Sequence, residues 1–301
     1  MEKRLKKALF IVNPHAGKGL IKNHLLTIVD ILVKAGYMVT VYTTQDRGEA
    51  IEVTKNRDRE YELVVCSGGD GTLDEVVTGM MQSGFRTKIG YIPAGSTNDF
   101  ANSLKLPNSM KRAAQVIASG QTFSCDVGLF NQDVFVYVAA FGIFTEVSYE
   151  TPQELKNVLG HTAYLLEGIK QIQNIKSTYM KVTYDDTVIE GNFIFGMITN
   201  SHSIGGFKNI TGKDVSLNDG LFEVMLVKRP NNIMELNMIL AALVSEKIDA
   251  ECMYSFKTAS LTIESKEEVA WTLDGEFGGK HTKVELLNKQ EAVDILVKEL
   301  R

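Results

Sequence analysis

The sequence predicts an α/β + β protein, in which an N-terminal α/β domain with a parallel sheet precedes a C-terminal, mostly antiparallel β domain. The 301 residues are long for a single core, and hydrophobic residues make up 44% of them, enough for two ordinary domains. Strand-like and helix-like runs alternate up to about residue 122, and closely spaced strand-like runs follow. This change in the pattern of expected elements indicates a change of architecture along the chain.

The first third of the chain alternates short β-branched runs with longer amphipathic ones. Strands are expected at residues 8–12, 39–43, 63–66 and 88–92. Helices are expected between them at residues 23–35, 49–56 and 73–82. The first helix should stop at Gly36, a residue type that commonly ends helices.

The second part reads as a series of strands interrupted by two helices. Strands are expected at residues 123–127, 134–140, 180–184, 191–199, 221–227, 260–263, 269–273 and 283–287. The two helices are expected at residues 154–173 and 232–245. Exposed strand edges in such a domain would favour a homodimer.

Charge and composition exclude several classes of protein. A net charge of -5 argues against a general nucleic-acid binder, which needs a dense basic surface. The 3 cysteines are widely separated, and no His-Glu-x-x-His pair occurs, so a metal site is expected to use oxygen ligands. The longest apolar run, residues 135–144, is too short to span a bilayer, and the N-terminus lacks the features of a signal peptide. We therefore expect a cytoplasmic protein.

Three glycine-rich segments each follow an expected strand of the α/β part. Such positions bind ligands in open parallel sheets, because they lie beyond the carboxyl ends of the strands. The segments are Asn13-Pro14-His15-Ala16-Gly17-Lys18-Gly19, Ser67-Gly68-Gly69-Asp70-Gly71-Thr72-Leu73-Asp74-Glu75 and Pro93-Ala94-Gly95-Ser96-Thr97-Asn98-Asp99. The first could equally be a plain turn, and Asn98 and Asp99 could equally be helix caps.

The middle segment carries the strongest signal. Three glycines in four positions let the backbone curl around a phosphate, and the following helix adds a favourable N-terminal dipole. Asp70 within this loop would repel phosphate, so it is better suited to a Mg²⁺ ion or to a proton in transfer. The structural alternative is a turn residue at a helix start.

Two acidic segments stand out in the β part. Asp214, Ser216, Asn218 and Asp219 precede an expected strand and could hold a hard cation or form an ordinary turn. Glu276 follows Asp274-Gly275, where a rigid turn could present a general base or be only a hairpin.

Taken in order, NPHAGKG, SGGDGTLDEV, PAGSTNDFA, SLNDGL and LDGE resemble the diacylglycerol kinase catalytic family, closest to soluble bacterial lipid kinases related to sphingosine kinases. The resemblance runs from Asn13 to about Leu287. It implies an ATP-binding α/β domain at residues 1–125, joined by a return of about residues 289–301, and a β-sandwich domain for the lipid substrate at residues 126–288.

The resemblance also implies site residues and cofactors. ATP would be bound by Asn13, Pro14, His15, Ala16, Gly17, Thr44, Ser67, Gly68, Gly69, Asp70, Gly71, Thr72, Leu73, Ser96 and Asn98. Asp70 would lie at the centre of the phosphate and Mg²⁺ site, and Glu276 would be the base that prepares a lipid hydroxyl for attack. A second, structural Mg²⁺ site would be formed by Ser216, Asp219 and the backbone carbonyl of Leu221.

Two positions depart from the family pattern. Ser96 replaces the usual Thr and keeps the hydroxyl. Asp74 replaces the usual Asn and adds a negative charge one helical turn from the phosphate loop, which could weaken binding or contribute to metal coordination.

The function expected is ATP- and Mg²⁺-dependent phosphoryl transfer to a lipid hydroxyl, with diacylglycerol giving phosphatidic acid. The enzyme would then contact the membrane surface peripherally, and the basic residues at the N-terminus could contribute to that contact or simply be solvated. The alternatives are an NAD kinase-like or other small-molecule kinase, and a nucleotide-binding regulator without transfer activity. Glycine loops and oxygen ligands suit phosphoryl transfer in each kinase reading.

Overall fold

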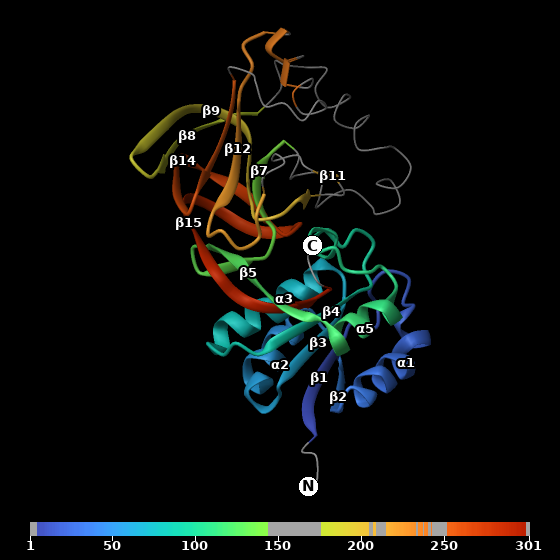
Figure 1. Ribbon diagram of the computed structural model, residues 1–301. Coiled ribbons are helices and arrows are strands. Elements are labelled where there is room, and N and C mark those ends of the chain that lie inside the picture. The colour runs from blue at the N-terminus through green and yellow to red at the C-terminus, as the bar shows by residue number, and fades with distance from the viewer. Residues whose placement is uncertain are drawn as a thin grey trace.

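The computed structural model describes residues 5–143, 176–204, 207–208, 215–232, 234–236, 238–239, 242 and 252–298 (Figure 1). Strands and helices alternate first, as β1 (Lys6–Val12), α1 (Ile21–Lys34), β2 (Tyr37–Thr43), α2 (Glu49–Arg57), the 3-10 helix η1 (Asp58–Glu60), β3 (Leu63–Gly68), α3 (Asp70–Ser83), β4 (Lys88–Pro93), α4 (Asp99–Ser103) and α5 (Met110–Ser119). Strands then dominate, as β5 (Gln121–Phe130), β6 (Asp133–Phe135), β7 (Val138–Gly142), β8 (Thr178–Tyr184), β9 (Thr187–Thr199), β10 (Ser203–Ile204), β11 (Phe207–Lys208), β12 (Phe222–Lys228), β13 (Met253–Thr258), β14 (Ser260–Leu273) and β15 (Glu276–Val297).

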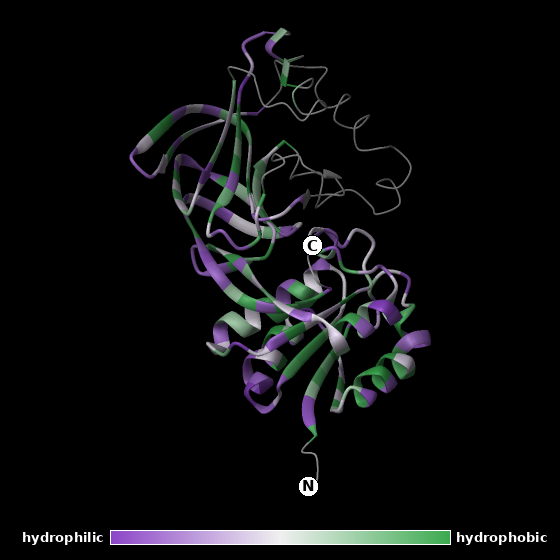
Figure 2. Cartoon of the chain, in the orientation of Figure 1, coloured by the Kyte–Doolittle hydropathy of each residue, from purple (hydrophilic) through white to green (hydrophobic). Residues whose placement is uncertain are grey.

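The N-terminal part is an α/β layer structure, as predicted. Its strands are parallel and lie in the order β2-β1-β3-β4. Successive side chains of β1 point to opposite faces, so Leu9 and Ile11 pack with α2 and α3 while Ala8 and Phe10 pack with α1 and α5. Because helices cover both faces, the strands are almost continuously hydrophobic, and β1 in Figure 2 is hydrophilic only at its first residues.

The C-terminal part is mostly antiparallel, which confirms the second half of the predicted fold class. Strands β13, β12, β9, β7, β14 and β15 follow one another in the sheet, and every pairing among them is antiparallel. Trp271 is fully buried at the centre of this part and makes edge contacts with Phe130 and Phe141. Aromatic packing of this kind supplies a large share of the apolar area in a core.

The long strand β15 joins the two parts. Its first half pairs with β14 and its second half with β5, and Ile295 lies beside Ile89 of β4 in the parallel direction. In Figure 1, β15 descends from the β part onto the edge of the α/β part. The domain boundary expected between residues 125 and 126 falls inside β5.

Several elements differ from the prediction. The strand expected at residues 134–140 is interrupted between β6 and β7, where the N–H groups of Val136, Tyr137 and Val138 donate to the Asp274 carboxylate. The strands expected at residues 260–263 and 269–273 are one strand, β14, with an irregular register. Helix α5 and strand β13 were not predicted.

Two expected helices fall wholly or in part outside the described residues. Residues 154–173 are not described, whereas the described positions within residues 232–245 include helical ones. Within the described part of the chain, no helix is both long and apolar enough to cross a membrane.

Candidate active site

The three glycine-rich loops lie together at the carboxyl ends of β1, β3 and β4. The Asn13 side-chain amide donates to the Thr72 hydroxyl over 3.2 Å, and the Asn13 backbone N–H donates to the Ser67 carbonyl over 2.9 Å. A Cβ placed on Gly95 would lie 2.6 Å from the Gly69 Cα, so these two loops can approach only because both residues lack side chains. The loops therefore form one glycine-lined surface.

Helix α3 begins inside the second loop. It starts at Asp70, three residues earlier than predicted, and ends at Gly84, whose positive φ suits a helix C-terminus. The unpaired N–H groups of a helix start and its dipole favour an anion at this position. Sequence, loop geometry and helix direction thus indicate a phosphate site.

The other predicted nucleotide residues have different surroundings. Thr44 is buried beyond the end of β2, where its N–H donates to the Val12 carbonyl. His15 and Ser96 are exposed. The Asn98 side chain bonds to both the N–H and the carbonyl of Gly95, so it shapes the third loop.

Asp70 is the first residue of α3, and its side chain contacts the start of α4. Its two carboxylate oxygens accept the backbone N–H groups of Asp99 and Phe100 at 3.2 and 3.4 Å. Burial, followed by the nearby Asp99 charge, raises the pKa of Asp70 to about 6, although the backbone N–H groups oppose the change. A carboxylate with a pKa close to the physiological range suits proton or cation chemistry.

The C-terminal part contributes Glu276 to the same site. An oxygen of its carboxylate would lie 3.9 Å from a Cβ placed on Gly71, in the first turn of α3. Its side chain is 55% exposed and forms a 3.2 Å ion pair with Arg47, a residue that sequence analysis did not single out. Asp70 and Glu276, which are about 200 positions apart in the sequence, thus lie at the start of the same helix.

Asp274 was predicted only as part of a turn, but the structure gives it several partners. Asp274 is buried, and its carboxylate accepts the N–H groups of Val136, Tyr137 and Val138 at 2.5, 3.0 and 2.8 Å. Asp74 in α3 hydrogen-bonds to this same carboxyl group. The Asp-Gly pair after a strand was the sequence signal for a turn, but it did not reveal the partners.

Another carboxylate organises the neighbouring helix. Glu75 accepts the N–H groups of Gly48 and Ala50 at 2.8 and 3.2 Å, and so caps the start of α2 from α3. Gly48 has a φ of 82°, which glycine adopts readily. This contact fixes the loop that carries Arg47.

Comparisons with known proteins agree with this arrangement. Residues 7–130 match the diacylglycerol kinase catalytic domain, and residues 138–295 match the YegS C-terminal NAD kinase beta sandwich-like domain. A diacylglycerol kinase of Bacillus subtilis is 33% identical over 91% of both chains, and one of Staphylococcus epidermidis is 36% identical over 96% of this chain and 92% of its own. The chain belongs to the diacylglycerol kinase family. The predicted resemblance and the predicted phosphotransferase class are therefore confirmed, and membership in this kinase family implies the use of ATP.

Solved structures show the same fold. A Bacillus anthracis structure is 26% identical, with a TM-score of 0.85, and covers 99% of this chain and 97% of its own. A second Bacillus anthracis structure, described as a diacylglycerol kinase, is 22% identical with a TM-score of 0.76 over 99% of both chains. The β-sandwich predicted for the second part agrees with the description of its family match.

The loop expected to hold a second Mg²⁺ ion contains an ion pair. Ser216 donates to the Asn218 side chain, and Asp219 accepts the Leu221 N–H at 3.1 Å. The Lys257 ammonium lies 3.4 Å from Asp219 and 3.0 Å from the buried Glu223. The oxygen donors are of the kind that Mg²⁺ uses, but Lys257 already balances their charge. No group of three or more His, Cys, Asp or Glu side chains suited to a metal occurs among the residues that the structure describes.

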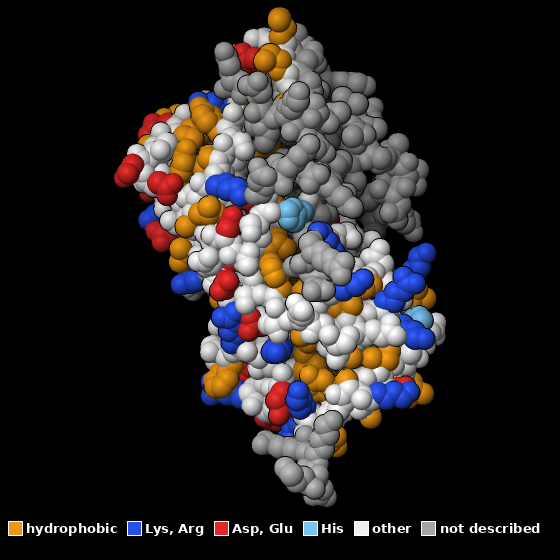
Figure 3. All heavy atoms as spheres, viewed as in Figure 1, with side chains coloured by type: hydrophobic (Ala, Val, Ile, Leu, Met, Phe, Trp, Pro, Cys, Tyr) orange, Lys and Arg blue, Asp and Glu red, His pale blue; other side chains and the backbone are white. Residues whose placement is uncertain are grey.

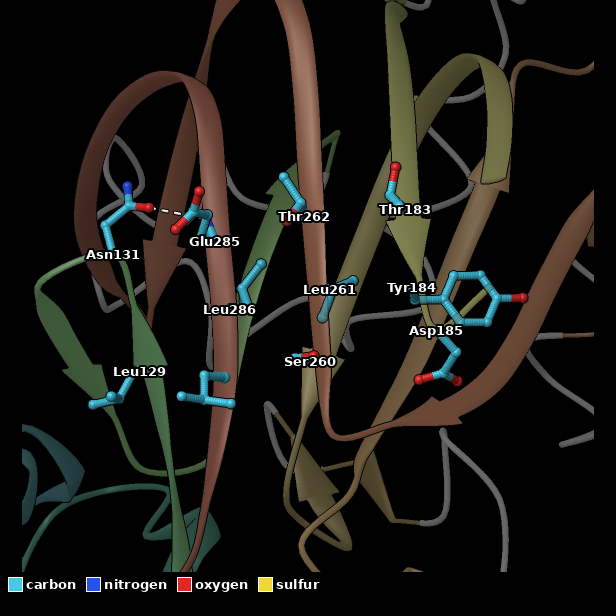
Figure 4. Close-up of a pocket in the computed structure, with 11 residues that line it drawn as sticks. Leu129, Asn131, Thr183, Tyr184, Asp185, Ser260, Leu261, Thr262, Glu285 and Leu286 are labelled. Atoms are coloured by element: carbon cyan, nitrogen blue, oxygen red, sulfur yellow. Dashed lines mark hydrogen bonds between the residues drawn. The ribbon is translucent and has the colours of Figure 1, made fainter. Parts of the chain in front are cut away.

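A cavity of about 430 Å³ lies elsewhere, among strands β5, β8, β14 and β15 (Figure 4). In it, Asn131 accepts the Glu285 backbone N–H, and Leu129 and Leu261 line the wall. None of the residues of the glycine loops lines this cavity. We place the chemistry at the loops because a helix start and carboxylates of both parts converge there.

Proposed function

We propose that this protein transfers the γ-phosphate of ATP to the hydroxyl of a lipid, and that the lipid is diacylglycerol, which becomes phosphatidic acid. The observation that carries the proposal is the position of Glu276 against the start of α3, beside Asp70. Such a carboxylate can accept a proton from a hydroxyl that approaches a phosphate on the glycine loops. The names of the relatives supply the substrate class.

The proposed step divides between the two parts of the chain. The glycine loops and the start of α3 bind and orient the phosphates. Glu276 takes the proton of the lipid hydroxyl while the hydroxyl oxygen attacks the γ-phosphorus, and the bond between the γ-phosphorus and ADP breaks. Asp70 is the carboxylate placed to hold Mg²⁺ at the phosphates. When bound, Mg²⁺ neutralises phosphate charge that develops during transfer.

The lipid acceptor also implies a peripheral contact with a membrane. Lys6 and Lys7 start β1, at the opposite end of the strand from the glycine loops. Figure 1 shows the first residues of β1 at the end of the α/β part that lies away from the β part. The geometry therefore favours an approach of the membrane on the side of Glu276. On the face in Figure 3, basic and acidic side chains of the described residues are mixed on the left, whereas Lys and Arg side chains gather on the right of the α/β part.

The test compares phosphate transfer to diacylglycerol in mixed micelles with transfer to NAD in plain buffer, using Mg-ATP. Product in the lipid phase that disappears with Asp70→Asn supports the proposal. Glu276→Gln should lower kcat while the KM for ATP changes little, because Glu276 acts on the acceptor. Transfer to NAD alone, or ATP binding without any transfer, would contradict the lipid kinase function. A defect of Glu276→Gln confined to ATP binding would move Glu276 to the nucleotide site.

A further inference from the structure

Two carboxyl groups from different parts of the chain contact each other behind the candidate active site. Asp74 lies on α3, one turn after Asp70, and Asp274 lies in the turn between β14 and β15. The two side chains are hydrogen-bonded. The Asp74 Oδ1 is shielded from solvent and has no hydrogen-bond partner within the described structure. Two carboxyl groups can form such a bond only when one of them carries a proton.

The surroundings decide which group holds the proton. The backbone N–H groups of Val136, Tyr137 and Val138 all donate to the Asp274 carboxylate, and such donors stabilise the charged form. Among the described residues, Asp74 has no comparable set of donors. Its pKa is raised well above the usual range, first by burial and then by the Asp274 charge. Asp74 is therefore the neutral acid that donates, and Asp274 the anion that accepts.

Two further carboxylates oppose a second negative charge at Asp74. The charges of Glu75 and Glu276 also raise the pKa of Asp74. Burial, together with the Asp70 charge, raises the pKa of Asp274 to about 6, although its three backbone N–H donors oppose this change. Burial, followed by the Asp274 charge, raises the pKa of the Tyr137 phenol. Arg47 pairs with Glu276 at the exposed edge. A second negative charge at Asp74 would thus be opposed by every carboxylate around it.

The contact has a geometric consequence for Glu276. Asp274 and Gly275 both adopt positive φ angles, 50° and 85°, and Glu276 follows as the first residue of β15. The direction of this short turn depends on how Asp274 is held. Its bonds reach the segment between β6 and β7 on one side and α3 on the other. Helix α3 also carries Asp70 and Gly71, which Glu276 faces.

We propose that Asp74 is a positioning residue: as a neutral carboxylic acid it donates a hydrogen bond to Asp274 and so holds the turn that places Glu276 against the glycine loop. This inference rests on the proposed lipid kinase function for its catalytic readout. The hydrogen bond itself is independent of the substrate, and it can be tested on stability alone. The Asp74 side chain thereby gains a role that neither contacts phosphate nor binds a metal.

The catalytic test compares Asp74→Ala with Asp74→Asn in the Mg-ATP and diacylglycerol assay. Asp74→Ala should lower kcat at least about tenfold with the KM for ATP nearly unchanged, because one hydrogen bond to a charged group is lost. Asp74→Asn should recover most of that loss, since the amide also donates to Asp274. An Asp74→Ala enzyme with wild-type kcat, or an Asn variant as impaired as the Ala variant, would overturn the proposal.

The stability test compares melting of the wild type, Asp74→Asn and the surface control Asp186→Asn from pH 4.5 to pH 8. The pKa of Asp74 is higher in the folded protein than in the unfolded chain. The wild type therefore loses stability relative to Asp74→Asn as the pH rises from the pKa in the unfolded chain towards the pKa in the folded protein. The Tm advantage of Asp74→Asn should therefore grow with pH, while Asp186→Asn stays parallel to the wild type. A constant difference for Asp74→Asn would show that Asp74 is ionised and refute the proposal. Absent transfer by the wild type would instead contradict the proposed function and leave this comparison intact.

Discussion

Replacing Asp70 by Asn should make the protein inactive and, above pH 6, more stable. Asp70 is the carboxylate at the start of α3, and burial raises its pKa from 3.8 to about 6. Folding therefore favours the protonated form, although at neutral pH the group is mostly ionised in both states. Asn has no charge to bury, so the cost that Asp70 imposes on the fold is removed.

The magnitude follows from the change in pKa. A pKa raised from 3.8 to about 6 corresponds to about 3 kcal/mol of stability at high pH, at 1.36 kcal/mol per unit. This contribution is absent below pH 3.8 and complete above pH 6, and about 2 kcal/mol of it develops between pH 4.5 and pH 7.5. For 301 residues, an unfolding entropy of about 2.1 cal/mol/K per residue converts that change to about 3 °C in Tm. The loss of one acceptor for the N–H groups of Asp99 and Phe100 lowers the variant by about 1 kcal/mol at every pH.

The assay is thermal melting of wild type and Asp70→Asn at half-unit steps from pH 4.5 to pH 7.5, with phosphate transfer measured on the same samples. Asp186→Asn, an exposed carboxyl between β8 and β9, is the matched control and should show no pH-dependent difference. We expect the Tm difference to rise by about 3 °C in favour of Asp70→Asn while transfer disappears. A difference that is flat with pH, or one that falls, would refute the argument that burial raises the pKa of Asp70.

Two further changes test other parts of the site. Gly95→Ala should raise the KM for ATP at least about tenfold, because the added Cβ would lie 2.6 Å from the Gly69 Cα and push the two glycine loops apart. An unchanged KM would show that the two loops do not bind the nucleotide together. Asp219→Ala should lower stability by about 1 kcal/mol and remove any rise of Tm with Mg²⁺, whereas identical wild-type melting in Mg²⁺ and EDTA would leave this loop with its Lys257 ion pair alone.

Sequence alone could predict the part of the site that depends on local rules. Parallel strands present their carboxyl ends at one edge of a sheet, so three loops that follow such strands had to lie near one another. The structure adds how close they are, through Gly69, Gly95 and Asn13. The start of α3 at Asp70 was not predicted, because Gly71 lowers the helix propensity of the first turn.

The contacts between the two parts could not be predicted in the same way. Asp74 and Asp274 are separated by 200 positions and belong to elements whose mutual placement depends on the long strand β15. The interruption between β6 and β7 has the same origin, since a distant side chain takes the N–H groups of residues 136–138 that a neighbouring strand would otherwise use. Periodicity reports which face of a strand is buried, but it carries no information about a distant carboxylate.

The charge of the site limits the form in which a nucleotide can bind. Asp70 is the first residue of α3, and Asp99 is the first residue of α4. Asp274 and Glu276 bring further carboxyl groups close to the start of α3. ATP brings further negative charge, and at short range like charges repel strongly where solvent is excluded. On the proposed function, free ATP should therefore bind much more weakly than Mg-ATP, because the metal offsets both sets of charges. The acidic residues therefore affect nucleotide binding as well as phosphate transfer, because they favour ATP that already carries the Mg²⁺ ion needed for the transfer.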